Sequence, residues 1–304
     1  IYWMGRKKLN IIVACVSSKS LPIPSGLEFR DIELDTISKM ADQWIDKLRS
    51  TESPIIEAHE LYSGAAWKTI IEAKKVSDSL EGFDVEWYIM SVGYGLIKWN
   101  QPIKPYSITF SKPSFDGLRK RILKQEANRE WWDYITTKRK FKISDIATND
   151  STTIVLGSTE YINAVREDLS KSKNIMIFSS TYNARYFKDK HVQTHEKLRF
   201  ITGGGKIDNN ARNLKFVLEH LNKWGSNLKD ININLKNIIS NIKQELPEVN
   251  RNRKSIDSKE AKKAILEVGL DKPMANYINK IRGEMNRKIS EQVIISYIQE
   301  LKNE

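Results

Sequence analysis

The fold of this chain is most strongly constrained by four short apolar segments that alternate with helical patterns. They are residues 9–16 (LNIIVACV), 85–92 (VEWYIMSV), 152–157 (TTIVLG) and 174–180 (NIMIFSS). Continuous runs of this length, rich in β-branched residues, are typical of strands buried on both faces of a sheet. The alternation predicts βαβ units, and so an α/β fold: a three-layer sandwich with a central four-stranded parallel sheet.

The pattern changes near residue 226, where only helical periodicity remains. A long helix is expected at residues 228–246, ended by Pro247, and a polar linker and three short helices follow it. We therefore predict an α/β domain at residues 1–225 and a helical C-terminal appendage at residues 226–304. The appendage suits packing or dimerisation, and its many basic residues also suit DNA contact.

The charge balance favours a polyanionic partner. Fifty Lys and Arg against 38 acidic residues give a net charge of +12, which points first to nucleic acid. The chain is also rich in Lys, Asn and Ile, so a merely solvated surface remains the alternative. The residues expected to bind DNA, besides the C-terminal helices, are Arg119, Lys120, Arg121, Lys138, Arg139, Lys140, Arg185 and Lys206. No obligate protein partner is indicated.

Several classes of protein lack support in the sequence. It contains no GxSxG, HExxH or GxGxxG, and TGGGK at residues 202–206 lacks Walker spacing, although it suits a simple anion-binding nest. A single cysteine, Cys15, and four scattered histidines predict no disulfide, metal or cofactor, and suit the cytoplasm. His191 and His195 have i,i+4 spacing, but HVQTH has an extended pattern. No run of about eighteen apolar residues occurs, so no membrane contact is expected.

Polar and aromatic side chains cluster where the predicted strands end. In a parallel sheet the carboxyl ends of the strands meet at one edge, where ligands bind. The residues expected there to hold a base or sugar are Ser17, Ser18, Lys19, Tyr62, Ser63, Ser91, Tyr94, Tyr106 and Ser158. Gly93-Tyr94-Gly95 predicts a tight turn that allows close backbone approach. An ordinary loop, a helix-capping carboxylate at Glu60 and a core Tyr62 are the alternatives.

Three segments in order carry a resemblance to a known family. VACVSSKS, HELYSGAAWKTIIEA and WYIMSVGYGLI followed by IKPY resemble the bacterial domains of unknown function related to the YaaA stress protein. The similarity covers residues 9–106 and continues more weakly at TIVLGSTEYINAV. Two features depart from the family: an insertion at residues 25–57, and Ser107 where an acid often follows the Pro-Tyr pair.

The resemblance implies an α/β fold comparable to that of uracil-DNA glycosylases. Relatives look associated with DNA binding, with base-exchanging transglycosylases and with phage defence. A basic member of this size is similar to antiphage DNA glycosylases, which remove a modified base such as glucosylated hydroxymethylcytosine from phage DNA and leave abasic sites. A DNA glycosylase without a cofactor is therefore the expected function.

Cleavage of an N-glycosidic bond needs a carboxylate, because positive charge develops on the sugar. We expect Glu60 to fill this role, with Asp31, in the insertion, as the second choice. The target nucleotide must leave the base stack, and Trp131, Trp132 or Tyr182 could stack in its place, although each also fits a core position. The alternatives are a non-catalytic DNA-binding defence protein, a transglycosylase and a small-molecule nucleoside hydrolase.

Overall fold

The computed structural model describes residues 6–33, 35–111, 114–122, 124, 126–179, 186–243, 254–272, 276–277 and 279–303, except for the side chains of Lys120, Arg121, Asn279 and Gln292. The chain divides into two compact units, residues 1–245 and 246–304. Each unit is described by itself. No helix in the described ranges is long and apolar enough to cross a membrane.

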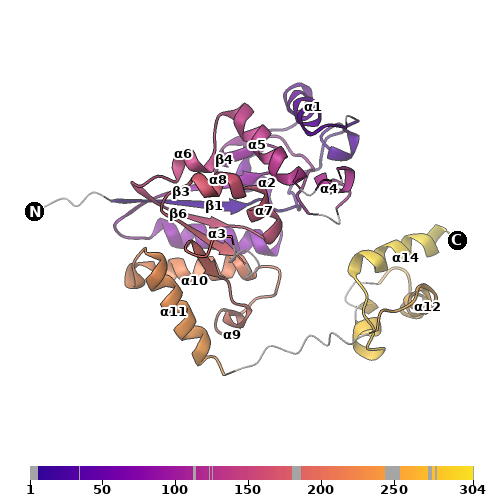
Figure 1. Ribbon diagram of the computed structural model, residues 1–304. Helices are drawn as coiled ribbons and strands as arrows, with labels where there is room; N and C mark the ends of the chain where they lie inside the picture. The colour runs from indigo at the N-terminus through magenta and orange to yellow at the C-terminus, as the bar shows by residue number, and fades with distance from the viewer. Residues whose placement is uncertain are drawn as a thin grey trace, which may run out of the picture. The chain divides into compact units, whose positions relative to one another are not determined.

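The first unit is built around a mostly parallel sheet of six strands (Figure 1). In spatial order they are β4 (Gly95–Lys98), β3 (Phe83–Ser91), β1 (Lys7–Ala14), β6 (Ser151–Leu156), β7 (Ile175–Ser179) and β8 (His191–Gln193). Only β4 runs antiparallel to its neighbour. The expected α/β fold is confirmed, but the count of four strands is too low. Strands β4 and β8 have four and three residues, too few to form a recognisable apolar run.

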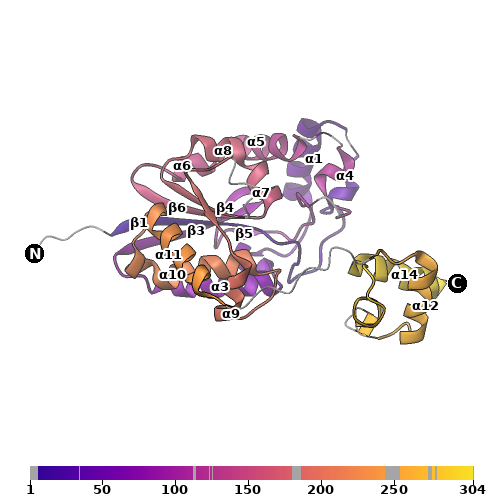
Figure 2. The ribbon, with the colours of Figure 1, turned by 60° about the horizontal axis from the view of Figure 1, so that its bottom comes forward.

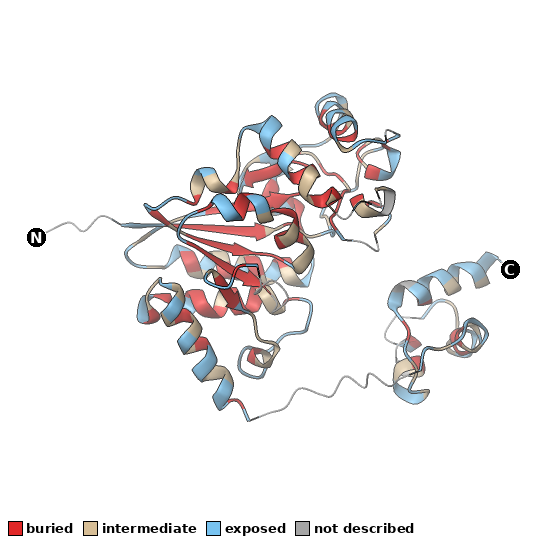
Figure 3. Ribbon diagram, viewed as in Figure 1, coloured by how far each residue is buried: buried red, intermediate tan, exposed pale blue. Residues whose placement is uncertain are grey.

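The register of the central strands brings their carboxyl ends to the same level. Ala14 of β1 pairs with Met90 of β3, and Val13 pairs with Leu156 of β6. The segments that leave these strands therefore begin side by side, as expected for a parallel sheet. Strands β6 and β7 are almost entirely buried, as are residues 9–13 of β1 and residues 87–91 of β3 (Figure 3).

Helices flank the sheet (Figures 1 and 2). One face carries α3 (Ala65–Asp78) and α10 (Asn209–Trp224), and the other carries α5 (Ala127–Arg139), α6 (Ile143–Ile146) and α8 (Arg166–Lys171). The remaining helices of the unit are α1 (Ile37–Ser50), α2 (Ala58–Leu61), α4 (Leu118–Arg121), α7 (Thr159–Ala164), α9 (Arg199–Thr202) and α11 (Leu228–Asn241). A two-residue ribbon joins β2 (Ile56–Glu57) to β5 (Pro102–Ile103).

Apolar spacing explains which face each helix buries. In α1 the buried residues Met40, Trp44, Ile45 and Leu48 recur at intervals of one helical turn. Trp131 of α5 is completely buried and donates its indole hydrogen to the Val92 carbonyl oxygen, 2.8 Å away. Trp131 and Trp132 are therefore core residues, so neither is placed to stack on an extruded nucleotide.

Helix α11 belongs to the first unit. Its Ile231 and Leu235 are buried in the main core, and the helix contacts α10 and β8. The predicted boundary at residues 225/226 thus differs from the structural division after residue 245, because the amphipathic face of α11 needs the sheet unit to cover it.

The second unit is helical and has its own small core. It contains α12 (Ser258–Val268), a π-helical segment η4 (Asn279–Glu284) and α14 (Glu291–Asn303). Ile265, Tyr277, Ile281 and Ile294 pack together in its interior. Helix α12 agrees with the expectation of short helices after the polar linker.

Candidate functional site

The first two predicted loops are joined by backbone hydrogen bonds. Ser20 donates its amide hydrogen to the Leu61 carbonyl oxygen at 2.8 Å, and Ser63 donates to Ser18 at 3.1 Å. Lys19 and Tyr62 form an antiparallel bridge between these two contacts. The loop after β1 and the segment around α2 therefore form one surface at the carboxyl edge, with Ser17 and Ser18 exposed and Ser63 half-buried.

A network of buried hydroxyl groups lies beneath this surface. The Tyr106 hydroxyl lies 2.6 Å from Ser91 Oγ, 2.8 Å from the Tyr62 hydroxyl and 3.8 Å from Cys15 Sγ. Cys15 Sγ is also 3.3 Å from the Tyr161 hydroxyl. Burial raises the pKa values of Tyr62 and Tyr106 well above their ordinary value, so both phenols stay neutral. They support the edge from below, and their side chains are buried rather than exposed to a ligand.

Lys19 lies directly above these phenols. Its ammonium group donates to the carbonyl oxygens of Val16 at 2.7 Å and Ser17 at 3.0 Å. The same nitrogen is 4.9 Å from the ring centre of Tyr62 and 5.1 Å from that of Tyr106, within range of a cation–π interaction. No described carboxylate forms an ion pair with it. Burial lowers the pKa of the Lys19 amine from 10.5 to about 8.

This shift predicts a pH dependence of stability. Between pH 8 and 10.5 the unfolded chain keeps the Lys19 proton that the folded chain has lost. The free energy of unfolding should therefore rise with pH in this window, by up to about 1.4 kcal/mol per pH unit. Urea denaturation at several pH values should show this rise in the parent protein and not in Lys19→Met. The exposed Lys206→Met serves as the control, and an equal slope in Lys19→Met would contradict the prediction.

Gly93 is required because aromatic rings pack against its backbone. A Cβ atom at this position would lie 2.8 Å from the Tyr106 ring and 3.2 Å from Trp44. The tight turn was expected to admit a ligand, but the groups that approach it are these two side chains.

Gly93→Ala should therefore reduce the free energy of unfolding by about 1–3 kcal/mol through overpacking, measured by urea denaturation. Gly205→Ala is the matched control, since its Cβ would meet only Asp208 Oδ1, at 4.0 Å. Equal effects of the two substitutions would contradict the packing argument.

The two predicted catalytic carboxylates are both on the surface. Glu60 is exposed in α2, and its backbone oxygen accepts a hydrogen bond from Ser20 Oγ at 2.7 Å. Asp31 is exposed in a short 3₁₀-helix, η1 (Phe29–Asp31). Neither side chain lines the polar pocket that adjoins the carboxyl edge.

That pocket has a volume of about 610 Å³ and lies where β6 ends. Helix α7 begins two residues after Gly157, and the pocket is enclosed by α7, α4 and the start of α5. Its lining consists of Arg119, Glu126, Asn128, Arg129, Thr159, Glu160, Asn163, Ala164, Arg166 and Tyr186. Ser158, at the N-cap of α7, is exposed next to this lining.

Charged groups dominate the pocket. Arg129 forms ion pairs with Glu126 at 3.5 Å and Glu167 at 3.2 Å. The Arg166 guanidinium lies 4.8 Å from the ring centre of Tyr186. Arg119 and Glu160 form no ion pair with any described residue. Arg166 likewise has no ion pair with a described residue, so two guanidinium groups and one carboxylate of the lining are not paired within the described part of the chain.

Two buried amide oxygens in the lining also lack partners. The side-chain oxygens of Asn128 and Asn163 accept no hydrogen bond, although the Asn128 amide donates to the Phe110 carbonyl oxygen at 3.3 Å. Buried polar atoms are normally satisfied, and these two oxygens are exceptions among the described residues; both are closed to solvent, so neither is an open acceptor in the pocket.

The expected DNA-binding residues are dispersed. Arg119 lines the pocket, and Lys138 pairs with Asp42 at 3.2 Å. Arg139 lies 5.5 Å from the ring centre of Tyr94, and Lys140 and Lys206 are exposed. Arg185 and Tyr182, and the side chains of Lys120 and Arg121, lie outside the described residues.

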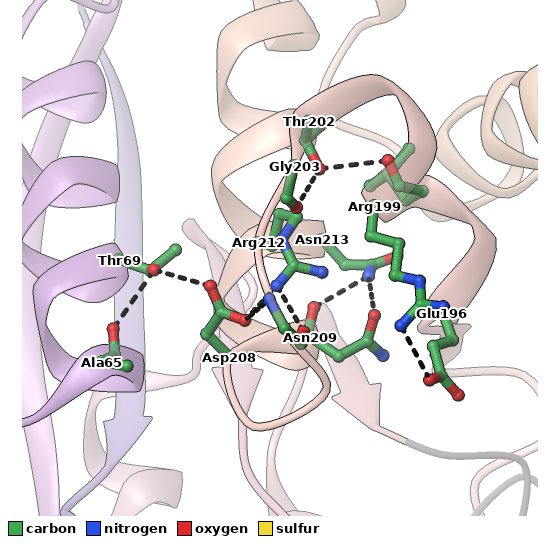
Figure 4. A network of polar contacts seen from close by, with 12 residues as sticks. Ala65, Thr69, Glu196, Arg199, Thr202, Gly203, Asp208, Asn209, Arg212 and Asn213 are labelled. Carbon is green, nitrogen blue, oxygen red and sulfur yellow. Dashed lines mark hydrogen bonds and ion pairs between the residues drawn. The ribbon is translucent and has the colours of Figure 1, made fainter. Parts of the chain in front are cut away.

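The glycine-rich loop at residues 202–206 is held to α10 (Figure 4). Arg212 is buried, pairs with Asp208 and donates to the Gly205 carbonyl oxygen at 2.6 Å. Gly204 has a φ of +90°, and a Cβ there would lie 2.4 Å from the Arg212 guanidinium. Gly204 thus makes room for a protein arginine, whereas a Cβ at Gly203 would meet no atom within 4 Å.

No family model matches this chain, and no curated protein matches it significantly. Within the described ranges, no group of three or more His, Cys, Asp or Glu side chains is arranged to hold a metal ion.

Proposed function

We propose that the protein is a DNA glycosylase that removes a modified base from foreign DNA and leaves an abasic site. The observation that carries the proposal is the pocket at the end of β6, whose lining combines arginines, carboxylates and asparagines. Its volume of about 610 Å³ falls within the usual range for small-molecule sites, about 300–1,000 Å³. A three-layer arrangement comparable to that of uracil-DNA glycosylases is part of this proposal.

Each group in the pocket suits a step of N-glycosidic cleavage. Arg119 would bind a phosphate next to the extruded nucleotide. Asn128 and Asn163 would form part of the wall against which the base, or a sugar attached to it, is held. The carboxylate of Glu160 would stabilise the positive charge that develops on the deoxyribose and orient the attacking water.

The Lys19 surface supports this reaction from the neighbouring part of the edge. As an ammonium below pH 8, Lys19 favours negative charge on a departing base or on a phosphate. Ser17 and Ser18 add exposed hydroxyl groups on the same loop. In this proposal the catalytic carboxylate is Glu160 in the pocket, and the loop that contains Ser17, Ser18 and Lys19 binds an anion beside it.

The test incubates the purified protein with phage DNA containing glucosylated hydroxymethylcytosine and with unmodified DNA. Released bases are identified by mass spectrometry and abasic sites are counted. Release of a base from modified DNA alone supports the proposal. Salt-sensitive binding without base release from either DNA overturns the glycosylase and favours a non-catalytic DNA-binding protein. Exchange of a supplied free base into the DNA would indicate a transglycosylase.

A further inference from the structure

A large aromatic side chain is exposed beside the pocket. Phe115 is 71% exposed, compared with 43% for Tyr186 and 37% for Phe200. It precedes α4, and Arg119, on the first turn of that helix, lines the pocket. The aromatic ring and the proposed nucleotide site are therefore presented by the same short segment.

The backbone that carries Phe115 is firmly held by the next residue. The buried carboxylate of Asp116 accepts hydrogen bonds from the Arg30 backbone N–H at 3.1 Å and from its guanidinium at 3.1 and 2.9 Å. It also accepts one from Ser107 Oγ at 2.6 Å. Thr109 donates to the Asp116 carbonyl oxygen at 3.0 Å. Because these hydrogen bonds hold the backbone at Asp116, the neighbouring Phe115 ring can be inserted into a bound macromolecule while the loop keeps its conformation.

The charges around Phe115 match a nucleic-acid backbone. The Arg30 guanidinium, about half exposed, lies 6.0 Å from the centre of the Phe115 ring. Arg119 follows on the other side in the sequence and forms no ion pair with a described residue. Arg30 is already paired with Asp116 and Glu28, so Arg119 is the one of these two arginines that can contact a phosphate while the apolar ring enters between base pairs.

We infer that Phe115 is the wedge that enters the base stack of duplex DNA and fills the gap left by the nucleotide that rotates into the pocket. The inference rests on the proposed function, because it needs an extruded nucleotide. Trp131 and Trp132, the sequence candidates for this role, are buried in the core.

The experiment measures unstacking without requiring base release. The probe is a short duplex with 2-aminopurine beside one glucosylated hydroxymethylcytosine, mixed with full-length Glu160→Gln protein so that the DNA stays intact. Protein binding should increase the 2-aminopurine fluorescence. Adding Phe115→Ala should abolish most of this increase and weaken duplex binding about tenfold, whereas Phe115→Trp should restore both.

Two controls separate a wedge from a general effect. Phe200→Ala, at another exposed aromatic residue, should leave the signal unchanged. Binding to the corresponding single strand, which has no stack to open, should not change in Phe115→Ala. An unchanged fluorescence increase in Phe115→Ala, or no increase with the parent protein, overturns the wedge. Unstacking that depends on Phe115, in a protein that releases no base, keeps the wedge and overturns only the glycosylase.

Discussion

Replacing Glu160 with Gln should slow base release by about 10²–10⁴-fold and leave DNA affinity nearly unchanged. The carboxylate lines the pocket and has no described ion-pair partner, so its negative charge is available to the sugar in the transition state. Glutamine keeps the shape and hydrogen-bonding capacity but can neither stabilise a developing cation nor accept a proton from water. Single-turnover base release and a fluorescence binding assay measure the two quantities separately.

Glu60→Gln and Asp31→Asn are the matched comparisons for this prediction. Both carboxylates are exposed and lie outside the pocket lining, so these variants should retain near-parent rates. Loss of activity in Glu60→Gln with normal activity in Glu160→Gln would move the reaction to the Lys19 surface. It would also confirm the choice of carboxylate that follows from the sequence.

Replacing Asp168 with Ala should lower the free energy of unfolding by about 3 kcal/mol. The Asp168 side chain is buried and accepts hydrogen bonds from the backbone N–H groups of Ile143 at 2.8 Å and Ser144 at 2.9 Å. It also accepts a longer one from Trp132 Nε1, at 3.4 Å. Its loss leaves the start of α6 without an acceptor, and each unsatisfied buried donor costs about 1–3 kcal/mol.

Asp133→Ala is the control for this stability prediction. Asp133 also carries one charge on a neighbouring helix, but its ion pair with Lys142, at 2.8 Å, is on the surface, with Asp133 68% exposed. Such pairs contribute at most about 1 kcal/mol. Urea denaturation followed by circular dichroism should separate the two variants. Similar midpoints would show that Asp168 has no special role in anchoring α6.

The sheet was predictable because burial on both faces leaves a continuous apolar run. All residues of β1 from Leu9 to Val13 are buried, and only Asn10 among them is polar. Strands β4 and β8 were not predicted, since four or three residues carry too little pattern. Helix α11 was assigned to the appendage because amphipathic spacing shows that a face is buried, but not which unit covers it.

The candidate site was predictable only in part. Parallel strands bring their carboxyl ends together, so the nearness of Lys19, after β1, and Ser91, at the end of β3, follows from the sheet. Tyr62 follows α2 and Tyr106 follows β5, and these two join the group through contacts that the strand pattern does not show. Which hydroxyl groups become buried depends on long-range packing. Glu160 was not among the predicted residues, because Ser158 marked this end of β6 as a candidate site without showing which side chains of α7 line the pocket.

The number of basic residues also did not show which of them are paired with other side chains of the protein. Lys138 and Arg139 read as a basic patch, yet the structure pairs one with Asp42 and stacks the other on Tyr94. Both partners are distant in sequence, so the pattern could not reveal them. Net charge therefore does not reveal which basic residues are already paired within the protein.

The reactivity of the Cys15 thiol can report how often the structure around it opens. Cys15 is the single cysteine of the chain, 5% exposed, and it lies against the hydroxyls of Tyr106 and Tyr161 at the carboxyl edge. A thiol reagent can react only when this edge opens, so the rate of modification gives the frequency of that opening. Repeating the measurement with DNA present would show, without any label, whether a bound strand holds the edge closed.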